Sequence, residues 1–230
     1  MSIRTAPIAF LLALPLASCV VVLGPDGEGG WTGRHGSTVR GSGVRAEVDR
    51  EVGEFRSVRL EVCANVLVRV GEAPSVHLAG DDNLLGRVET RVETGRLSID
   101  LDGSASFRCG LEIVIGTPTL EGFTIEGSGD VRIQDLAAER VRLAIEGSGT
   151  LRAQGTARSV EGSIEGSGDM DLAALETESA ELSIEGSGSM DVLVARELRY
   201  AIEGSGHIRY AGGADVDGRI EGSGRIERGR

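Results

Sequence analysis

The pentapeptide Ile125-Glu126-Gly127-Ser128-Gly129 recurs five more times in this chain, beginning at Ile145, Ile164, Ile184, Ile202 and Ile220. Successive copies start 20, 19, 20, 18 and 18 residues apart. A unit of this length is too short for a strand, a helix and a second strand, but it suffices for one coil of a β-solenoid. The repeat therefore predicts an all-β chain in which about six coils of 18–20 residues stack as a parallel β-helix.

Apolar and polar residues alternate on both sides of each Gly-Ser-Gly. In one coil Val141, Leu143 and Ile145 precede the motif, and Leu151 and Ala153 follow it. A period of two predicts strands that bury one face and leave the other in water. Both glycines fall in the inward phase, so we expect the chain to bend there, where no Cβ fits.

The spacing between repeats varies in one part of each coil only. Insertions are tolerated in loops and would shift the register of a ladder elsewhere, so these segments are predicted to be outer turns. They comprise residues 134–140, 154–159, 173–179, 193–197 and 211–215. The last coil places Arg228 at an inward position, where a charge predicts a cap that discourages further strand pairing.

Residues 1–18 have the pattern of a bacterial export signal, with a basic start at Arg4 followed by a short apolar run. The run falls short of the roughly 20 residues that a transmembrane helix needs. The sequence Leu16-Ala17-Ser18-Cys19 resembles the lipobox of bacterial lipoproteins, which implies cleavage before Cys19 and lipidation of its thiol. The alternative is an ordinary signal peptide with an incidental cysteine.

This pattern leads us to expect an exported protein of the bacterial cell envelope, attached to the membrane through its lipid. Val20 after the cysteine is compatible with the outer membrane of a Gram-negative cell, facing either the periplasm or the exterior. Residues 19–50 are rich in glycine and polar residues, and we expect a flexible tether there.

Residues 51–230 are predicted to form a single β-helix domain, with an irregular part at 51–118 and the regular repeats at 119–230. The irregular part is either the first portion of the solenoid or a sandwich-like cap on it. Its expected strands lie at 58–70, 76–78, 88–92, 97–101 and 111–115.

The charge and the cysteines restrict the function. A formal net charge of −12 argues against a nucleic-acid partner. With Cys19 assigned to the lipid, Cys63 and Cys109 are an even pair in an exported protein, which predicts a disulfide. The alternative is two buried thiols that pack as small apolar residues.

The repeat places one glutamate at the same outward position of each coil. Neighbours in such a column lie about 4.8 Å apart. The column is either a solvated stripe or a linear edge that binds Ca²⁺ or a cationic polymer, with Asp169, Asp171 and Asp191 as additional oxygen ligands. Its members are Glu126, Glu146, Glu165, Glu185, Glu203 and Glu221.

No His, Cys or Ser residue belongs to a recognisable nucleophile group, so we expect neither an enzyme nor a cofactor beyond the Ca²⁺ option. Parallel β-helices include polysaccharide lyases, which use Asp-bound Ca²⁺ and a basic proton acceptor. Asp169, Asp171, Asp191 and Arg209 therefore form an alternative catalytic set.

Several motifs in order resemble the head GIN domain proteins, described as putative auto-transporter adhesins. They comprise residues 55–71, 76–83 with Asp81-Asp82-Asn83, 92–99, 111–120, and the repeats up to Tyr210. The resemblance implies a right-handed parallel β-helix on an exported, often lipid-anchored protein, and it brings no catalytic residues.

The leading functional hypothesis is a non-catalytic, adhesin-like module that contacts a glycan or a cell-surface partner through the long solenoid face. An envelope scaffold without a dedicated ligand is the alternative from the structural class, and a polysaccharide-active enzyme is the third.

Overall fold

The computed structural model describes residues 38–108 and 110–229. The export signal, Cys19, most of the predicted tether and Cys109 lie outside these residues. The regular part comprises β10 (Gly122–Gly127), β11 (Asp130–Gly147), β12 (Thr150–Gly166), β13 (Asp169–Gly186), β14 (Ser189–Gly204), β15 (His207–Ala211), β16 (Asp215–Gly222) and β17 (Arg225–Arg228).

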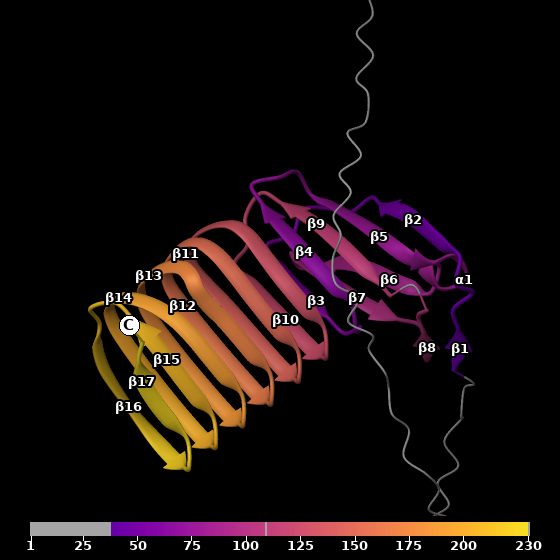
Figure 1. The fold of residues 1–230 in the computed structure, drawn as a ribbon. Helices are drawn as coiled ribbons and strands as arrows, with labels where there is room; N and C mark the ends of the chain where they lie inside the picture. Colours follow the sequence, from indigo (N-terminus) through magenta and orange to yellow (C-terminus); the bar gives the residue numbers. More distant parts are fainter. Residues whose placement is uncertain (1–37, 109, 230) are drawn as a thin grey trace, which may run out of the picture.

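These strands form the predicted parallel β-solenoid, which makes about five turns. The six repeat isoleucines pair in register from coil to coil, and so do the glutamates and glycines that follow them. Figure 1 shows the coils side by side, with the ends of the repeat strands in a row along one edge. The sequence repeat is thus a spatial repeat.

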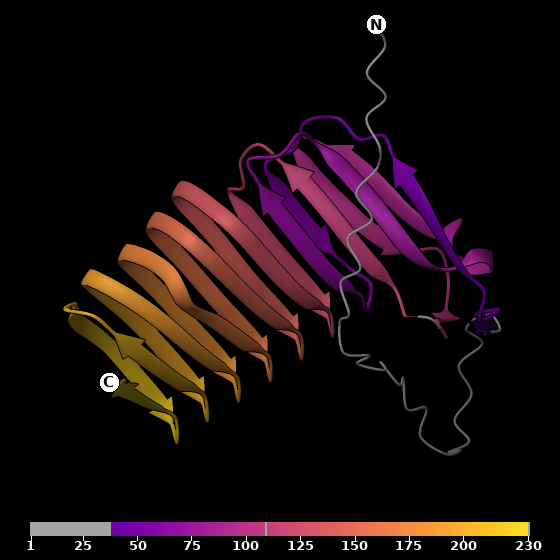
Figure 2. The same cartoon turned by 45° about the horizontal axis from the view of Figure 1, so that its top comes forward.

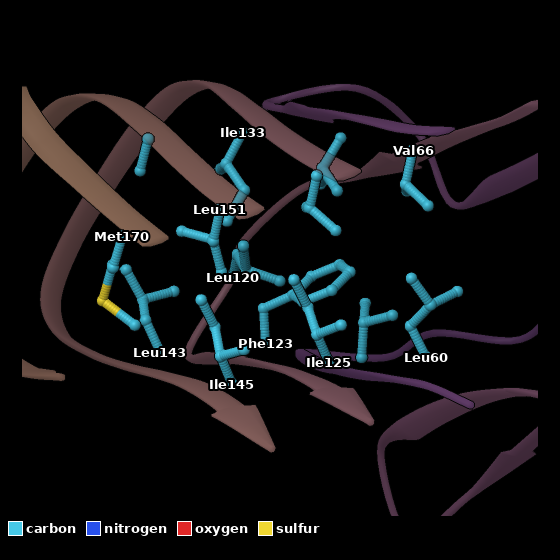
Figure 3. Packing of buried hydrophobic residues seen from close by; sticks show 14 of the residues in the cluster. Leu60, Val66, Leu120, Phe123, Ile125, Ile133, Leu143, Ile145, Leu151 and Met170 are labelled. Carbon is cyan, nitrogen blue, oxygen red and sulfur yellow. The ribbon is translucent and has the colours of Figure 1, made fainter. Parts of the chain in front are cut away.

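The inward residues of successive coils form one continuous apolar core. Ile125, Ile145, Ile164, Ile184 and Ile202 are each no more than 1 % exposed, and Ile220 in the outermost coil is 38 % exposed. Figure 3 shows Leu143, Ile145 and Leu151 projecting into the same interior. Burial of this alternating set, at about 25 cal/mol per Å² of apolar surface, is the main force that stacks the coils.

The Gly-Ser-Gly corners require glycine, as predicted. Gly166 has φ +126°, and a Cβ on it would lie 2.4 Å from the carbonyl oxygen of Gly147 in the coil below. A Cβ on Gly168 would lie 2.7 Å from Cγ2 of Ile145. The corners stack as closely as the strands because Ser167 N–H donates to that same Gly147 carbonyl over 2.9 Å.

The prediction that the segments of variable length are outer turns without strand pairing is wrong. The ladder continues through them, so that β11, β12, β13 and β14 each run through a bend, and only register shifts mark the segments where repeat length varies. Bends stacked on bends can pair their backbone groups, which removes the need for an unpaired loop. The repeat pattern also did not reveal four buried apolar residues in these segments: Leu136, Ala157, Leu175 and Val194.

The irregular part begins the same solenoid, but not in chain order. Its parallel strands are β3 (Ser57–Leu60), β4 (Asn65–Val70), β7 (Arg96–Leu101) and β9 (Glu112–Thr117). β3 lies between β7 and β10, and β4 lies between β9 and β11. The coil formed by β3 and β4 is therefore inserted between a later segment and the first regular repeat.

Antiparallel strands close this end of the solenoid. β6 (Val88–Glu93) forms a hairpin with β7, and β5 (Ser75–Asp81) pairs with β9 on one side and β2 (Arg45–Arg50) on the other. A single helical turn, α1 (Asp82–Leu85), follows β5. In Figure 2 these strands lie at the end opposite the C-terminus.

The predicted tether extends too far. Within residues 19–50, β1 (Val39–Arg40) pairs in parallel with β8 (Ala105–Ser106), and β2 belongs to the antiparallel end. Residues 39–50 have no long apolar alternation that would predict a strand. They are held in strands by backbone pairing with β8 and β5, which are distant in the sequence. None of the described residues belongs to a helix with the length and apolarity to span a bilayer.

Asp81 closes the first corner of the fold. It is fully buried, and its carboxylate accepts the backbone N–H of Gly43 at 2.6 Å and of Arg108 at 2.7 Å. The N–H of Ser42 donates to Oδ1 of Asn83 at 2.9 Å. Side-chain oxygens of Asp81 and Asn83 therefore accept the backbone N–H groups of this segment.

Candidate functional site

A shallow groove crosses the outer face of the solenoid. It has a volume of about 460 Å³ and spans four coils, from β12 to β16. Its small outward residues Ser163, Ser183 and Ala201 stand in register, and a charged outward row runs two residues earlier in each coil. The charged row comprises Glu161, Glu181, Arg199 and Asp217.

The glutamate column lies on the same face, two residues beyond the small row. Its six members are in register, as predicted, and all but the half-buried Glu126 are exposed at the surface. Each end of the column has an arginine nearby: Arg59 pairs with Glu126, and Arg219 lies 3.5 Å from both Glu203 and Glu221. Among the described residues Glu146, Glu165 and Glu185 form no ion pair.

Arginines on this face are held in their charged form. A hydrogen bond to the carboxylate of Glu126 and its negative charge raise the pKa of the Arg59 guanidinium above its ordinary value. Glu161, 2.8 Å away on the next coil, raises the pKa of Arg142 in the same way. Both stay protonated at any physiological pH, so the face does not switch through them.

The three aspartates do not join the glutamate column. Asp169, Asp171 and Asp191 follow the Gly-Ser-Gly corner, whereas the glutamates precede it. Arg209 lies 3.4 Å from Asp191, and Arg152 lies 4.0 Å from Asp171. No group of three or more His, Cys, Asp or Glu side chains within 38–108 and 110–229 is arranged to hold a metal ion.

Cys63 is disulfide-bonded. It stands at the corner between β3 and β4, where the repeats have the serine of Gly-Ser-Gly. Asn65 donates its N–H to the carbonyl of Leu111 at 2.9 Å, which brings the segment next to Cys109 to this corner. The pairing with Cys109 stays a prediction, since Cys109 lies outside the described residues.

The groove itself was missed from the sequence. The alternation in each strand predicted which residues point outward. It did not predict that small and charged outward residues form neighbouring rows, because this depends on the register between successive coils. One further glutamate, Glu61, was also missed: it follows Leu60, which pairs with Ile125, and Arg59 contacts its carboxylate at 3.1 Å. Aligning residues 57–65 with the repeats would have found it.

Like charges in the unpaired middle of the column repel one another. Adjacent carboxylates about 4.8 Å apart cost about 0.9 kcal/mol in a water-like dielectric. These three residues form two adjacent pairs, so the triple variant Glu146→Gln, Glu165→Gln, Glu185→Gln is expected to be about 2 kcal/mol more stable to urea at low salt. The gain should vanish at 1 M salt, where the screening length is about 3 Å.

The same urea titration tests the Ca²⁺ option. If the column binds Ca²⁺, millimolar Ca²⁺ stabilises the wild type and leaves the triple variant unchanged. Equal responses of the two proteins to Ca²⁺ and to monovalent salt of the same ionic strength would dispose of a cation site here.

The fold and the face together define the class of protein: a parallel β-solenoid with antiparallel strands at one end and a grooved, polar outer surface. The chain belongs to the family described as putative auto-transporter adhesin, head GIN domain, whose model matches residues 54–214.

Solved structures of bacterial proteins share this fold. A putative adhesin from Bacteroides fragilis is 22 % identical with a TM-score of 0.66, covering 83 % of this chain and 99 % of its own. A putative lipid binding protein from Parabacteroides distasonis is 20 % identical with a TM-score of 0.57, over 84 % and 100 %. A putative adhesin from Parabacteroides merdae is 19 % identical with a TM-score of 0.57, over 85 % and 100 %. No functionally curated protein matches the chain significantly.

Proposed function

We propose that this protein is an exported, lipid-anchored β-solenoid that acts as a non-catalytic, adhesin-like binding module, with the grooved face as its contact surface. Membership of a family described as adhesins supports the binding role. The lipobox-like sequence that ends at Cys19 supports attachment to the envelope. This sequence lies outside the described residues.

The observation that carries the proposal is the in-register groove. Three small side chains, with Arg219 at the same position of the fourth coil, lie beside a charged row and give a linear depression across four coils. Such a shape fits an extended polymer better than a compact small molecule, because the groove runs across successive strands that lie about 4.8 Å apart.

The chemistry of the groove favours a hydroxyl-rich or cationic ligand. Ser163, Ser183 and the carboxylates of Glu161 and Glu181 are hydrogen-bond acceptors, and the neighbouring column carries three carboxylates without ion pairs. The three column carboxylates without ion pairs would repel a polyanion, although Arg199 and Arg219 also line the groove. We therefore propose a neutral or amino-containing glycan of a cell surface as the ligand class.

A glycan and whole-cell binding screen with a lipid-free form, residues 20–230, tests this proposal. We expect binding that falls at least about tenfold in the triple variant Glu146→Gln, Glu165→Gln, Glu185→Gln, since rim charges act mainly through attraction of the ligand. The readout is the apparent dissociation constant at physiological salt.

The matched control removes the same number of charges from the bends on the other side of the coils. Glu139→Gln, Glu176→Gln, Glu178→Gln is expected to bind like the wild type. Equal losses in both triple variants would mean that only net charge matters. Failure to bind any glycan or cell would overturn the adhesin-like role and favour an envelope scaffold.

A further inference from the structure

The outermost coil leaves the outer edges of two strands, β16 and β17, uncovered in the described part of the chain. β16 pairs with β14, and no strand in the described part of the chain pairs with its other edge. All eight residues of β16 are exposed, which holds for no other strand within 38–108 and 110–229. An open edge of this kind is a template for pairing with another strand.

This edge also exposes core positions. Val216 and Ile220 stand in the inward rows, where their partners Leu198 and Ile202 are fully buried, yet each is 38 % exposed. They are two of the three large apolar residues that are exposed in the described part of the chain. The predicted cap residue does not cover them, because Arg228 instead donates to the carbonyl of Gly212 at 2.6 Å.

The sequence of β16 is self-complementary. It reads Asp215-Val216-Asp217-Gly218-Arg219-Ile220-Glu221-Gly222. When two copies run antiparallel about Gly218, Val216 faces Ile220 and Asp217 faces Arg219, and the twofold axis produces each pair twice. The single unfavourable pair, Asp215 against Glu221, falls at the ends of the strand, where solvent screens it.

Asp217 and Arg219 are available for the pairing that this antiparallel register requires. Asp217 forms no ion pair with any described residue, while Arg219 is 67 % exposed and is shared between two glutamates at 3.5 Å. Gly218 at the axis lies against Tyr200, whose carbonyl oxygen would be 2.2 Å from a Cβ at this position. The centre of the edge therefore carries no side chain, because the neighbouring coil excludes a Cβ there.

We propose that two copies of this chain associate through their last coils by antiparallel pairing of β16, with the twofold axis at Gly218. The apolar rows of the two solenoids then meet across the junction, and the edge backbone groups pair. This inference goes beyond the proposed function. This twofold axis is perpendicular to the sheet and lies between the two Gly218 residues, so the grooved faces of both copies are on the same side.

Charge reversal on β16 tests the register as well as the association. In sedimentation equilibrium, the wild-type protein is expected to have twice the mass of one chain at micromolar concentration. Asp217→Arg places two arginines against two arginines, and Arg219→Asp places two aspartates against two aspartates. Each variant is expected to raise the dimer dissociation constant at least about tenfold, because like charges on facing strands repel.

Mixing the two variants provides the rescue. A heterodimer of Asp217→Arg with Arg219→Asp restores an opposite pair at both positions, so the equimolar mixture is expected to sediment as a dimer. Circular dichroism spectra that match the wild type show that the variants are folded. A monomeric wild type, an open-ended series of larger species, or variants that dimerise alone as well as when mixed would each overturn the proposal.

Discussion

Replacing Gly166 with alanine is expected to lower the free energy of unfolding by about 3 to 5 kcal/mol, enough to unfold a marginally stable domain. The backbone at Gly166 has φ +126°, which L residues rarely adopt, and the new Cβ would lie 2.4 Å from the carbonyl oxygen of Gly147. This atom belongs to the rigid backbone of the next coil and cannot rotate away, so the two coils must separate.

The matched control is Ser167→Ala in the same corner. Ser167 is exposed, and only its backbone N–H takes part in the stacking, so the free energy of unfolding should change by no more than about 0.5 kcal/mol. Urea denaturation followed by circular dichroism measures both variants. Equal midpoints for Gly166→Ala and the wild type would mean that the corners do not set the coil spacing.

Replacing Asp81 with alanine is expected to cost about 3 to 5 kcal/mol, because a buried carboxylate that accepts charge-assisted hydrogen bonds is lost. The N–H groups of Gly43 and Arg108 would both lose their acceptor. Residues 39–43 and 105–108 would then keep the short pairing of β1 with β8 and the hydrogen bonds of Ser42 and Arg40 to Asp82 and Asn83. Hydrogen exchange should show their amides open before the regular repeats do.

Asp82→Ala serves as the charge-matched control. Asp82 is exposed and accepts one hydrogen bond from Ser42 Oγ at 2.6 Å, so its loss should cost about 1 kcal/mol or less. If Asp81→Ala and Asp82→Ala destabilised the protein equally, the buried carboxylate of Asp81 would not be what holds residues 43 and 108 together.

The regular half of the fold could be predicted closely, for a physical reason. Each coil of a solenoid contacts only its neighbours, so the alternation around Ile145 and the two corner glycines already determine what the next coil must present. The same logic placed Glu146 and its equivalents in one column without any coordinates.

The irregular half could not be ordered from the sequence. Leu60 pairs with both Ile99 and Ile125, although these residues lie 39 and 65 positions further along the chain. No local pattern encodes which distant segment a strand will join. The strands near residues 40 and 45–50 were missed for the same reason, since their stability comes from Asp81, Asn83 and β5.

The sequence by itself determined the strand period, the identity of the inward residues and the coil length, because those properties are local and repeat every 18–20 residues. Only the tertiary structure decided how the first coil is inserted, which glutamates lack a cation, where small and charged rows form a groove, and which edges stay open. These properties depend on register and on contacts between segments distant in the chain, and no window of sequence contains both partners.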